Sequence, residues 1–76
     1  MSPALPAVTA REVVRVAKKL GFTFRRQKGS HAIYRRQADG ARVTIAMHAG
    51  RTLPPKTLAG IVADMGISVA EFRKLL

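Results

Sequence analysis

Apolar residues recur with helical spacing in two segments of the chain, separated by a stretch that alternates. In the first segment one helix face carries Val13, Val16, Ala17 and Leu20. Thr9 and Glu12 have the spacing of a capping box at the start of this face, and Gly21 is a typical left-handed stop at its end. The pattern therefore predicts a helix over residues 10–20.

The second helical segment follows two consecutive prolines, Pro54 and Pro55, which are tolerated in the first turn of a helix. Its apolar stripe consists of Leu58, Ile61, Val62 and Met65, and Gly66 closes it. Ser68 and Glu71 then repeat the capping-box spacing. We expect them to open a short final helix, whose apolar residues are Val69, Phe72, Leu75 and Leu76.

Between the two helical segments the period changes to two, which is typical of strands. Phe22 and Phe24 alternate with Thr23 and Arg25, and this pattern predicts a strand over residues 22–27. A turn at residues 28–29 leads to a second strand over residues 30–36, and a hairpin turn at residues 38–40 leads to a third over residues 42–47. In the third strand one face carries Val43, Ile45 and Met47.

The second strand offers two faces, and its orientation decides whether its histidine is accessible. One face carries Ala32 and Tyr34, and the other carries His31, Ile33 and Arg35. We expect Ala32 and Tyr34 to point inward, because the opposite choice would bury an imidazole and a guanidinium together at a desolvation cost. Ile33 should then be partly exposed.

These elements predict an α+β fold in the order helix, three-stranded antiparallel sheet, helix and short C-terminal helix, with the helices on one face of the sheet. Residues 1–8 hold two prolines and no charged side chain, so we expect a flexible N-terminal arm before a single domain over residues 9–76. Residues 1–8 lack the features of a signal peptide, no apolar run approaches the ~20 residues of a membrane helix, and there is no cysteine. We therefore expect a cytoplasmic protein that does not bind membranes.

Charge narrows the choice of partner. Fourteen Lys and Arg against four Asp and Glu give a net charge of +10 on 76 residues. Such a charge density favours a polyanionic partner, through long-range attraction and counterion release. Nucleic acid and an acidic protein are the main candidates.

Five of the cations fall within residues 25–36, around the tripeptide Gly29-Ser30-His31. Gly29 allows close approach of a ligand to the backbone, and the Ser30 hydroxyl can hold a phosphate oxygen. His31 can transfer protons near neutral pH. The neighbouring cations that suit a phosphate best are Arg26, Lys28 and Arg35.

This set of groups fits RNA cleavage without a metal. RNA supplies its own nucleophile, the 2′-hydroxyl, so cleavage needs a base, an acid and cations that stabilise charge on the phosphate. DNA lacks this hydroxyl. The four acidic residues stand far apart in caps, turns or helix surfaces, and two histidines without any cysteine do not make a zinc site.

Two parts of the basic surface keep more than one interpretation. His48, at the end of the third predicted strand, fits the missing acid, a phosphate contact or simply an exposed strand end. The basic residues of the first helix fit either a solvated face or an extension of the RNA-binding surface; they are Arg11, Arg15, Lys18 and Lys19.

In order and spacing, several short motifs of the chain resemble the HicA family of toxin–antitoxin toxins. The matching pieces are Lys18-Lys19-Leu20-Gly21-Phe22, Gln27-Lys28-Gly29-Ser30-His31, Ile33-Tyr34-Arg35, Val43-Thr44-Ile45 running to His48, Thr57-Leu58, Met65-Gly66-Ile67-Ser68 and Glu71-Phe72. The chain departs from the family pattern at Ala46-Met47-His48, where a proline usually precedes the histidine, and at Pro54-Pro55-Lys56, where a glycine is common.

The resemblance implies a fold similar to the double-stranded-RNA-binding domain and a small ribonuclease that acts on mRNA. It also implies that His31 is catalytic and that a cognate HicB-like antitoxin, often a DNA-binding repressor, covers the active site. Our hypothesis is a metal-independent endoribonuclease toxin without a cofactor. In it Arg26, Lys28, Gly29, Ser30, Arg35 and His48 bind RNA around His31. The alternatives are a non-catalytic domain that binds structured RNA and an interaction module for an acidic protein.

Overall fold

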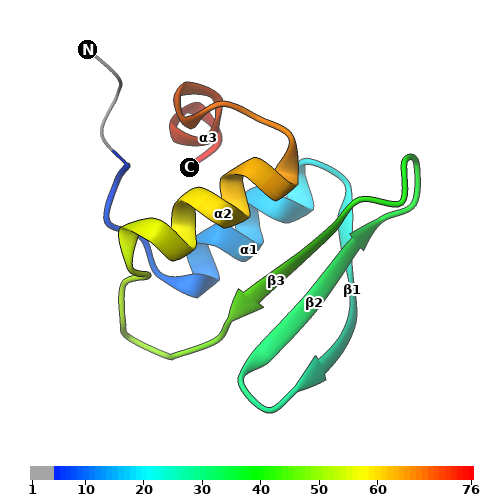
Figure 1. Ribbon diagram of the computed structural model, residues 1–76, viewed down its shortest axis with the longest axis horizontal. Helices are drawn as coiled ribbons and strands as arrows, with labels where there is room; N and C mark the ends of the chain where they lie inside the picture. Colours follow the sequence, from blue (N-terminus) through cyan, green and yellow to red (C-terminus); the bar gives the residue numbers. More distant parts are fainter. Residues whose placement is uncertain (1–4) are drawn as a thin grey trace.

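The structure is a computed structural model that describes residues 5–76. Its elements follow the order α-β-β-β-α-α, as the sequence predicted (Figure 1). Their bounds are α1 Ala10–Lys19, β1 Phe22–Lys28, β2 His31–Arg36, β3 Arg42–Ala46, α2 Pro55–Met65 and α3 Val69–Leu75. The predicted bounds were within one residue for β1, β2 and β3. The fold is therefore α+β, with one antiparallel sheet in the order β1-β2-β3.

Local sequence signals set the ends of the helices. At the start of α1 the Thr9 hydroxyl accepts from the Glu12 amide, and the Glu12 carboxylate accepts from the Thr9 amide in return. The same reciprocal box, made by Ser68 and Glu71, opens α3. Pro54 and Pro55 begin α2, and Gly66 ends it with a left-handed φ of 76°.

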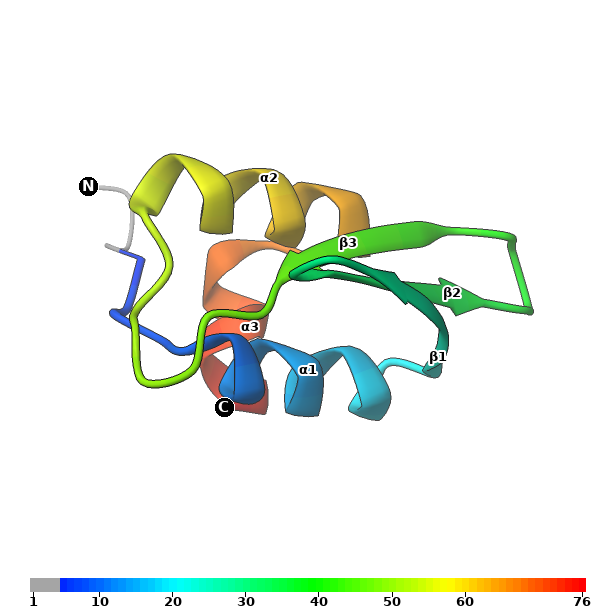
Figure 2. The same cartoon turned by 90° about the horizontal axis from the view of Figure 1, so that it is seen from below.

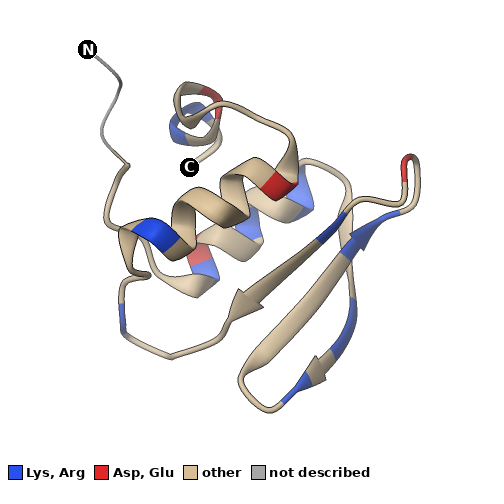
Figure 3. Ribbon diagram, viewed as in Figure 1, with Lys and Arg blue, Asp and Glu red and all other residues tan. Residues whose placement is uncertain are grey.

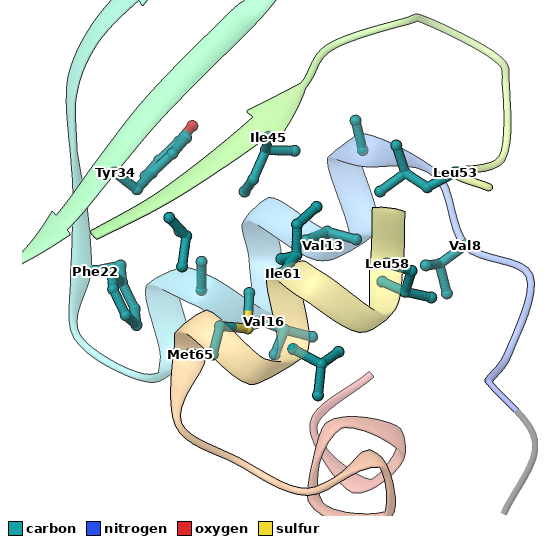
Figure 4. Close-up of a cluster of buried hydrophobic side chains, with 14 of the residues drawn as sticks. Val8, Val13, Val16, Phe22, Tyr34, Ile45, Leu53, Leu58, Ile61 and Met65 are labelled. Carbon is teal, nitrogen blue, oxygen red and sulfur yellow. The ribbon is translucent and has the colours of Figure 1, made fainter. Parts of the chain in front are cut away.

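The hydrophobic core lies between the helices and one face of the sheet. From the strands, Phe22, Tyr34 and Ile45 point toward apolar side chains of α1 and α2 (Figure 4). Ala32 and Tyr34 are buried, so the predicted orientation of β2 is confirmed. Phe72 of α3 is also fully buried, which ties the short last helix to the rest of the domain.

The residues just before α1 pack against the rest of the domain. We expected residues 1–8 to form a flexible arm; residues 1–4 lie outside the described residues. Val8 is only 2% exposed, and its carbonyl accepts a hydrogen bond from the Leu53 amide. The end of this segment therefore belongs to the folded domain, because its apolar side chain fills a space beside the loop that precedes α2.

The turn between β1 and β2 is short, and it lies away from the helices. β1 and β2 are joined by Gly29 and Ser30 alone, and Gly29 takes a left-handed φ of 59°, which a two-residue hairpin turn favours at this position. This turn lies at the bottom of Figure 1, away from the helices. Seen at right angles, α1 and α2 run beside the sheet, and the β2–β3 turn extends beyond them (Figure 2).

A β-bulge interrupts the pairing of β1 with β2. Phe24 pairs with Tyr34, but the next pair joins Arg26 to Ile33, so Arg25 is an extra residue. The simple alternation of β1 would place Phe22 and Phe24 in the core together. Phe24 precedes the extra residue and pairs with the inward Tyr34, so it shares the face of Phe22, although Phe24 is 52% exposed and Phe22 only 1%. The alternation of β1 changes only after Phe24.

Candidate functional site

The face of the sheet away from the helices brings together most of the predicted site residues. Three rows of partners cross this outer face: Lys28 with His31 and Ala46, Arg26 with Ile33 and Thr44, and Thr23 with Arg35 and Arg42. Directly opposed side chains in an antiparallel sheet have Cβ atoms ~5 Å apart. The rows therefore place His31 next to Lys28 and one row away from Arg26.

The bulge adds two cations to the outer face. If β1 alternated strictly from the buried Phe22, Arg26 and Lys28 would point toward the helices and Gln27 outward. The extra residue at the bulge reverses this parity, so Arg26 and Lys28 pair with the outward residues Ile33 and His31. A single irregularity thus moves two cations to the side of the sheet that carries the histidine.

We call Arg25, Arg26, Lys28, Arg35 and Arg42 the outer cations. All five are exposed, and within residues 5–76 their side chains make no hydrogen bond or ion pair. Lys and Arg occur on all three strands in Figure 3, whereas Asp and Glu lie on the helices and in the β2–β3 turn. The outer face is therefore a positively charged surface with its donors available to a ligand.

A shallow cavity of about 340 Å³ opens on the outer face. It is lined by Phe24, Arg25, Arg26, Ile33, Arg35 and Arg42, and we call it the arginine groove. His31 lies two residues before Ile33 on the same face of β2, which corresponds to ~7 Å along the strand. The groove and the imidazole thus belong to one continuous surface.

His31 is the first residue of β2 and is exposed. Its side chain has no hydrogen-bond partner among the described residues. The backbone before it is fixed, because the Ser30 carbonyl accepts from the Met47 amide at 2.6 Å and the Gly29 carbonyl accepts from the Gln27 side chain at 3.0 Å. The imidazole is therefore accessible to solvent on a backbone that is held from both sides.

Gly29 and Ser30 form the turn that directly precedes His31. A Cβ atom built on Gly29 would meet nothing within 4 Å, so the space above this residue is open. The Ser30 hydroxyl is half-buried and makes no hydrogen bond within residues 5–76. Both observations fit the predicted use of these residues, close approach of a ligand and a contact to a phosphate oxygen.

His48 is the predicted site residue that follows β3 rather than lying in the sheet or in the turn between β1 and β2. Met47 still bonds to Ser30, and His48 follows directly, so its backbone leaves the sheet near the Gly29–Ser30 turn. Its exposed side chain borders two other surface hollows, one beside Arg11 at the start of α1 and one beside Arg51 before α2. The structure shows no contact between His48 and His31.

Arg36, the last cation of the predicted cluster, makes contacts within the fold and does not belong to the outer cations. Its guanidinium donates two hydrogen bonds of 2.9 Å to the Asp39 carboxylate and lies 4.6 Å over the Phe22 ring. The Arg36 hydrogen bonds, with one from the Ala41 amide, lower the pKa of Asp39 to about 2. This ion pair closes the β2–β3 turn and keeps Arg36 away from the outer face.

Comparison with known protein families shows to which family the chain belongs. A family model described as the HicA toxin of bacterial toxin-antitoxin matches residues 10–67. The chain belongs to the HicA toxin family. The matched range contains all of the outer cations, His31 and His48, so the resemblance seen in the short motifs is confirmed at the level of the family. No curated protein matches the chain.

Membership of this HicA family makes the protein a toxin of a toxin–antitoxin system, with an antitoxin as its partner. No helix among the described residues has the length and apolar character needed to cross a membrane. No three His, Cys, Asp or Glu side chains within residues 5–76 lie close enough together to hold a metal ion.

Two outer cations were not among the residues singled out from the sequence. Arg42 had a readable signal, because the inward Val43 and Ile45 place residue 42 on the outer face. Arg25 also stood outward in the simple alternation of β1. What no pattern showed was the bulge, which adds Arg26 and Lys28 to the same face.

Proposed function

We propose that this HicA-family protein is a metal-independent endoribonuclease that cleaves mRNA, with His31 as the proton-transferring residue. The observation that supports this best is the exposed imidazole directly opposite Lys28, at the start of β2 and at one end of a cationic face. The proposal covers residues 9–76 as one ribonuclease domain acting in the cytoplasm, where mRNA is translated.

The chemistry follows from the groups on the outer face. The ribose 2′-oxygen attacks the adjacent phosphorus, the bond from phosphorus to the 5′-oxygen breaks, and a 2′,3′-cyclic phosphate and a 5′-hydroxyl result. One proton leaves the 2′-oxygen and one reaches the 5′-oxygen. His31 acts as the base or the acid in these transfers, a role that contributes ~100-fold to 10,000-fold in rate.

The remaining predicted residues hold the phosphate. Lys28, directly opposite His31, and Arg26, in the next row, stabilise charge that builds on the phosphate oxygens, and Arg35 extends this contact along the strand. Gly29 leaves room for the sugar–phosphate backbone, and the Ser30 hydroxyl donates to an oxygen of it. His48, beyond the turn, contacts the same RNA strand as it leaves the site.

The antitoxin partner fits the same surface. The outer cations have no acidic partner within the described chain, so a HicB-like antitoxin with an acidic surface would neutralise them and cover His31. Binding of the antitoxin and binding of RNA should then exclude each other.

The proposal is tested with purified protein, RNA and excess chelator. We expect the wild type to cut RNA in chelator and His31→Gln to cut at least ~100-fold more slowly, with unchanged RNA affinity and unchanged thermal unfolding. Cleavage by His31→Gln at the wild-type rate would overturn the role of His31. Binding without any cleavage by the wild type would support the alternative, a non-catalytic RNA-binding domain.

A further inference from the structure

The row of the sheet that contains His31 is the last one at its end of β2. Lys28, His31 and Ala46 are partners in this row, and beyond it β1 and β2 are joined by the short turn at Gly29 and Ser30. The turn between β2 and β3 lies at the other end of β2 (Figure 1). The imidazole is therefore at one end of the outer face and not at its centre.

Four of the five outer cations lie on one side of His31. One is in the next outward row, ~7 Å along the strand, and two are in the row after that, ~13 Å along. The fourth is the extra residue of the bulge, between these rows. In that order they are Arg26, Arg35 with Arg42, and Arg25. All four line the arginine groove, so the groove leads away from His31 in a single direction, toward the β2–β3 turn.

On the opposite side of His31 the chain after β3 runs to the helices and does not continue the sheet (Figure 1). The exposed cations in this part of the chain are Arg11 in α1, Arg51 in the loop before α2 and Lys56 in α2. The residue after Arg51 pairs with Thr9, so the loop lies against the start of α1, where the Glu12 carboxylate accepts from the Thr9 amide. None of these three cations lines the arginine groove.

We propose that the protein holds its RNA almost entirely on one side of the link that it cleaves. The inference rests on the proposed ribonuclease function and names the part of the substrate that is recognised. The cleaved link lies at His31 and Lys28, four phosphates on one side of it follow the arginine groove toward the β2–β3 turn, and His48 makes the one contact on the other side.

The two products of cleavage then differ in how they bind. The product from the held side keeps four phosphate contacts, which give a slope of log affinity against log salt concentration of about −2.8. The other product keeps Lys28 alone, with a slope of about −0.7. Between 50 and 200 mM salt, the affinity of the first product should fall roughly 50-fold and that of the second roughly threefold. The held product is thus the one that competes with new substrate.

The test maps the phosphate contacts without any cleavage. The probe is a short single-stranded RNA with 2′-fluoro riboses, which lack the nucleophile, and with one uncharged methylphosphonate link placed at successive positions. Fluorescence anisotropy gives the affinity at each position. Removing the charge of a link weakens binding to the wild type, but it has no effect on a variant that lacks the cation in contact with that link, because the interaction is already lost.

Four variants locate the contacts. Lys28→Gln marks the link at His31, and Arg35→Gln and Arg42→Gln mark links in the groove. Arg51→Gln is the matched control, because it and Arg42→Gln both carry a net charge of +9, ten minus one. Thermal unfolding shows that each variant folds.

We expect the links marked by Arg35→Gln and Arg42→Gln to lie on the same side of the link marked by Lys28→Gln. Each of these links should weaken binding to the wild type by roughly two- to fivefold when it is made neutral. Arg51→Gln should mark no link. The direction from the Lys28 link to the others shows whether the held side is the 5′ or the 3′ side.

Groove links on both sides of the Lys28 link would overturn the inference, and so would a link marked by Arg51→Gln on the opposite side. The same holds if none of the variants marks a link. The map is independent of catalysis, because the probe cannot be cut. A one-sided map from a protein that never cleaves RNA in chelator would contradict the ribonuclease proposal alone.

Discussion

The salt dependence of RNA binding measures whether the outer face is the surface that binds RNA. Each phosphate that a cation neutralises on a single strand adds about −0.7 to the slope of log affinity against log salt concentration. Five outer cations with one phosphate each give a slope of about −3.5. Between 50 and 200 mM salt the affinity of the wild type should therefore fall roughly 130-fold.

The informative perturbation removes two charges from the outer face. Arg25→Gln with Arg42→Gln should lower the slope to about −2.1, so that the same rise in salt weakens binding only roughly 20-fold. The matched control, Arg11→Gln with Arg15→Gln, removes two charges from the exposed side of α1. Both double variants carry a net charge of +8, ten minus two, so only the location of the charges differs.

The assay is fluorescence anisotropy with 2′-fluoro single-stranded RNA at several salt concentrations. We expect the α1 control to keep the slope of the wild type. Equal reductions in both double variants would refute the reasoning, because net charge rather than the outer face would then govern binding. A reduction only in the α1 variant would place the RNA on the first helix, the alternative that the sequence left open.

Two further predictions concern the turns on either side of β2. Because the folded-state pKa of Asp39 is about 2 against an ordinary 3.8, its ion pair with Arg36 stabilises the fold above that ordinary value, and the contribution is lost as the pH falls through 2. Urea unfolding at a series of pH values should therefore show Asp39→Asn less stable than the wild type at neutral pH and equally stable at the acid end; a constant difference would contradict this. Gly29→Ala forces a left-handed φ of 59° on a residue with a Cβ atom, so urea unfolding should show a loss of ~1 kcal/mol, and an unchanged midpoint would mean that the turn relaxes.

Most of the fold could be predicted because its signals are local. The capping boxes at Thr9 and Ser68, the apolar stripes of α1 and α2 and the glycine stops each act within a few residues. The inward orientation of Tyr34 followed from a single energetic argument, the cost of burying His31 with Arg35. The turn predicted at residues 28–29 lies one residue later in the structure, at Gly29 and Ser30, and its signal was the glycine that two-residue hairpins favour.

The rest of the site depends on how neighbouring strands meet. A bulge is a property of two paired strands, and nothing in the order Phe24-Arg25-Arg26 marks the extra residue. The same limit applies to Arg36, which belongs to the sequence cluster around His31 but pairs with Asp39 across the following turn. Charge patterns along a chain indicate a basic surface, and the register of the sheet decides which cations share a face.

The most direct test of the central claim is the identity of the RNA ends after cleavage in chelator. If the 2′-hydroxyl is the nucleophile and His31 moves the protons, every cut should leave a 2′,3′-cyclic phosphate and a 5′-hydroxyl, and a single 2′-deoxy substitution at the cleaved link should abolish that cut. Products with a 3′-hydroxyl and a 5′-phosphate, or unchanged cutting at the deoxy position, would mean that water attacks the phosphate and would contradict the account.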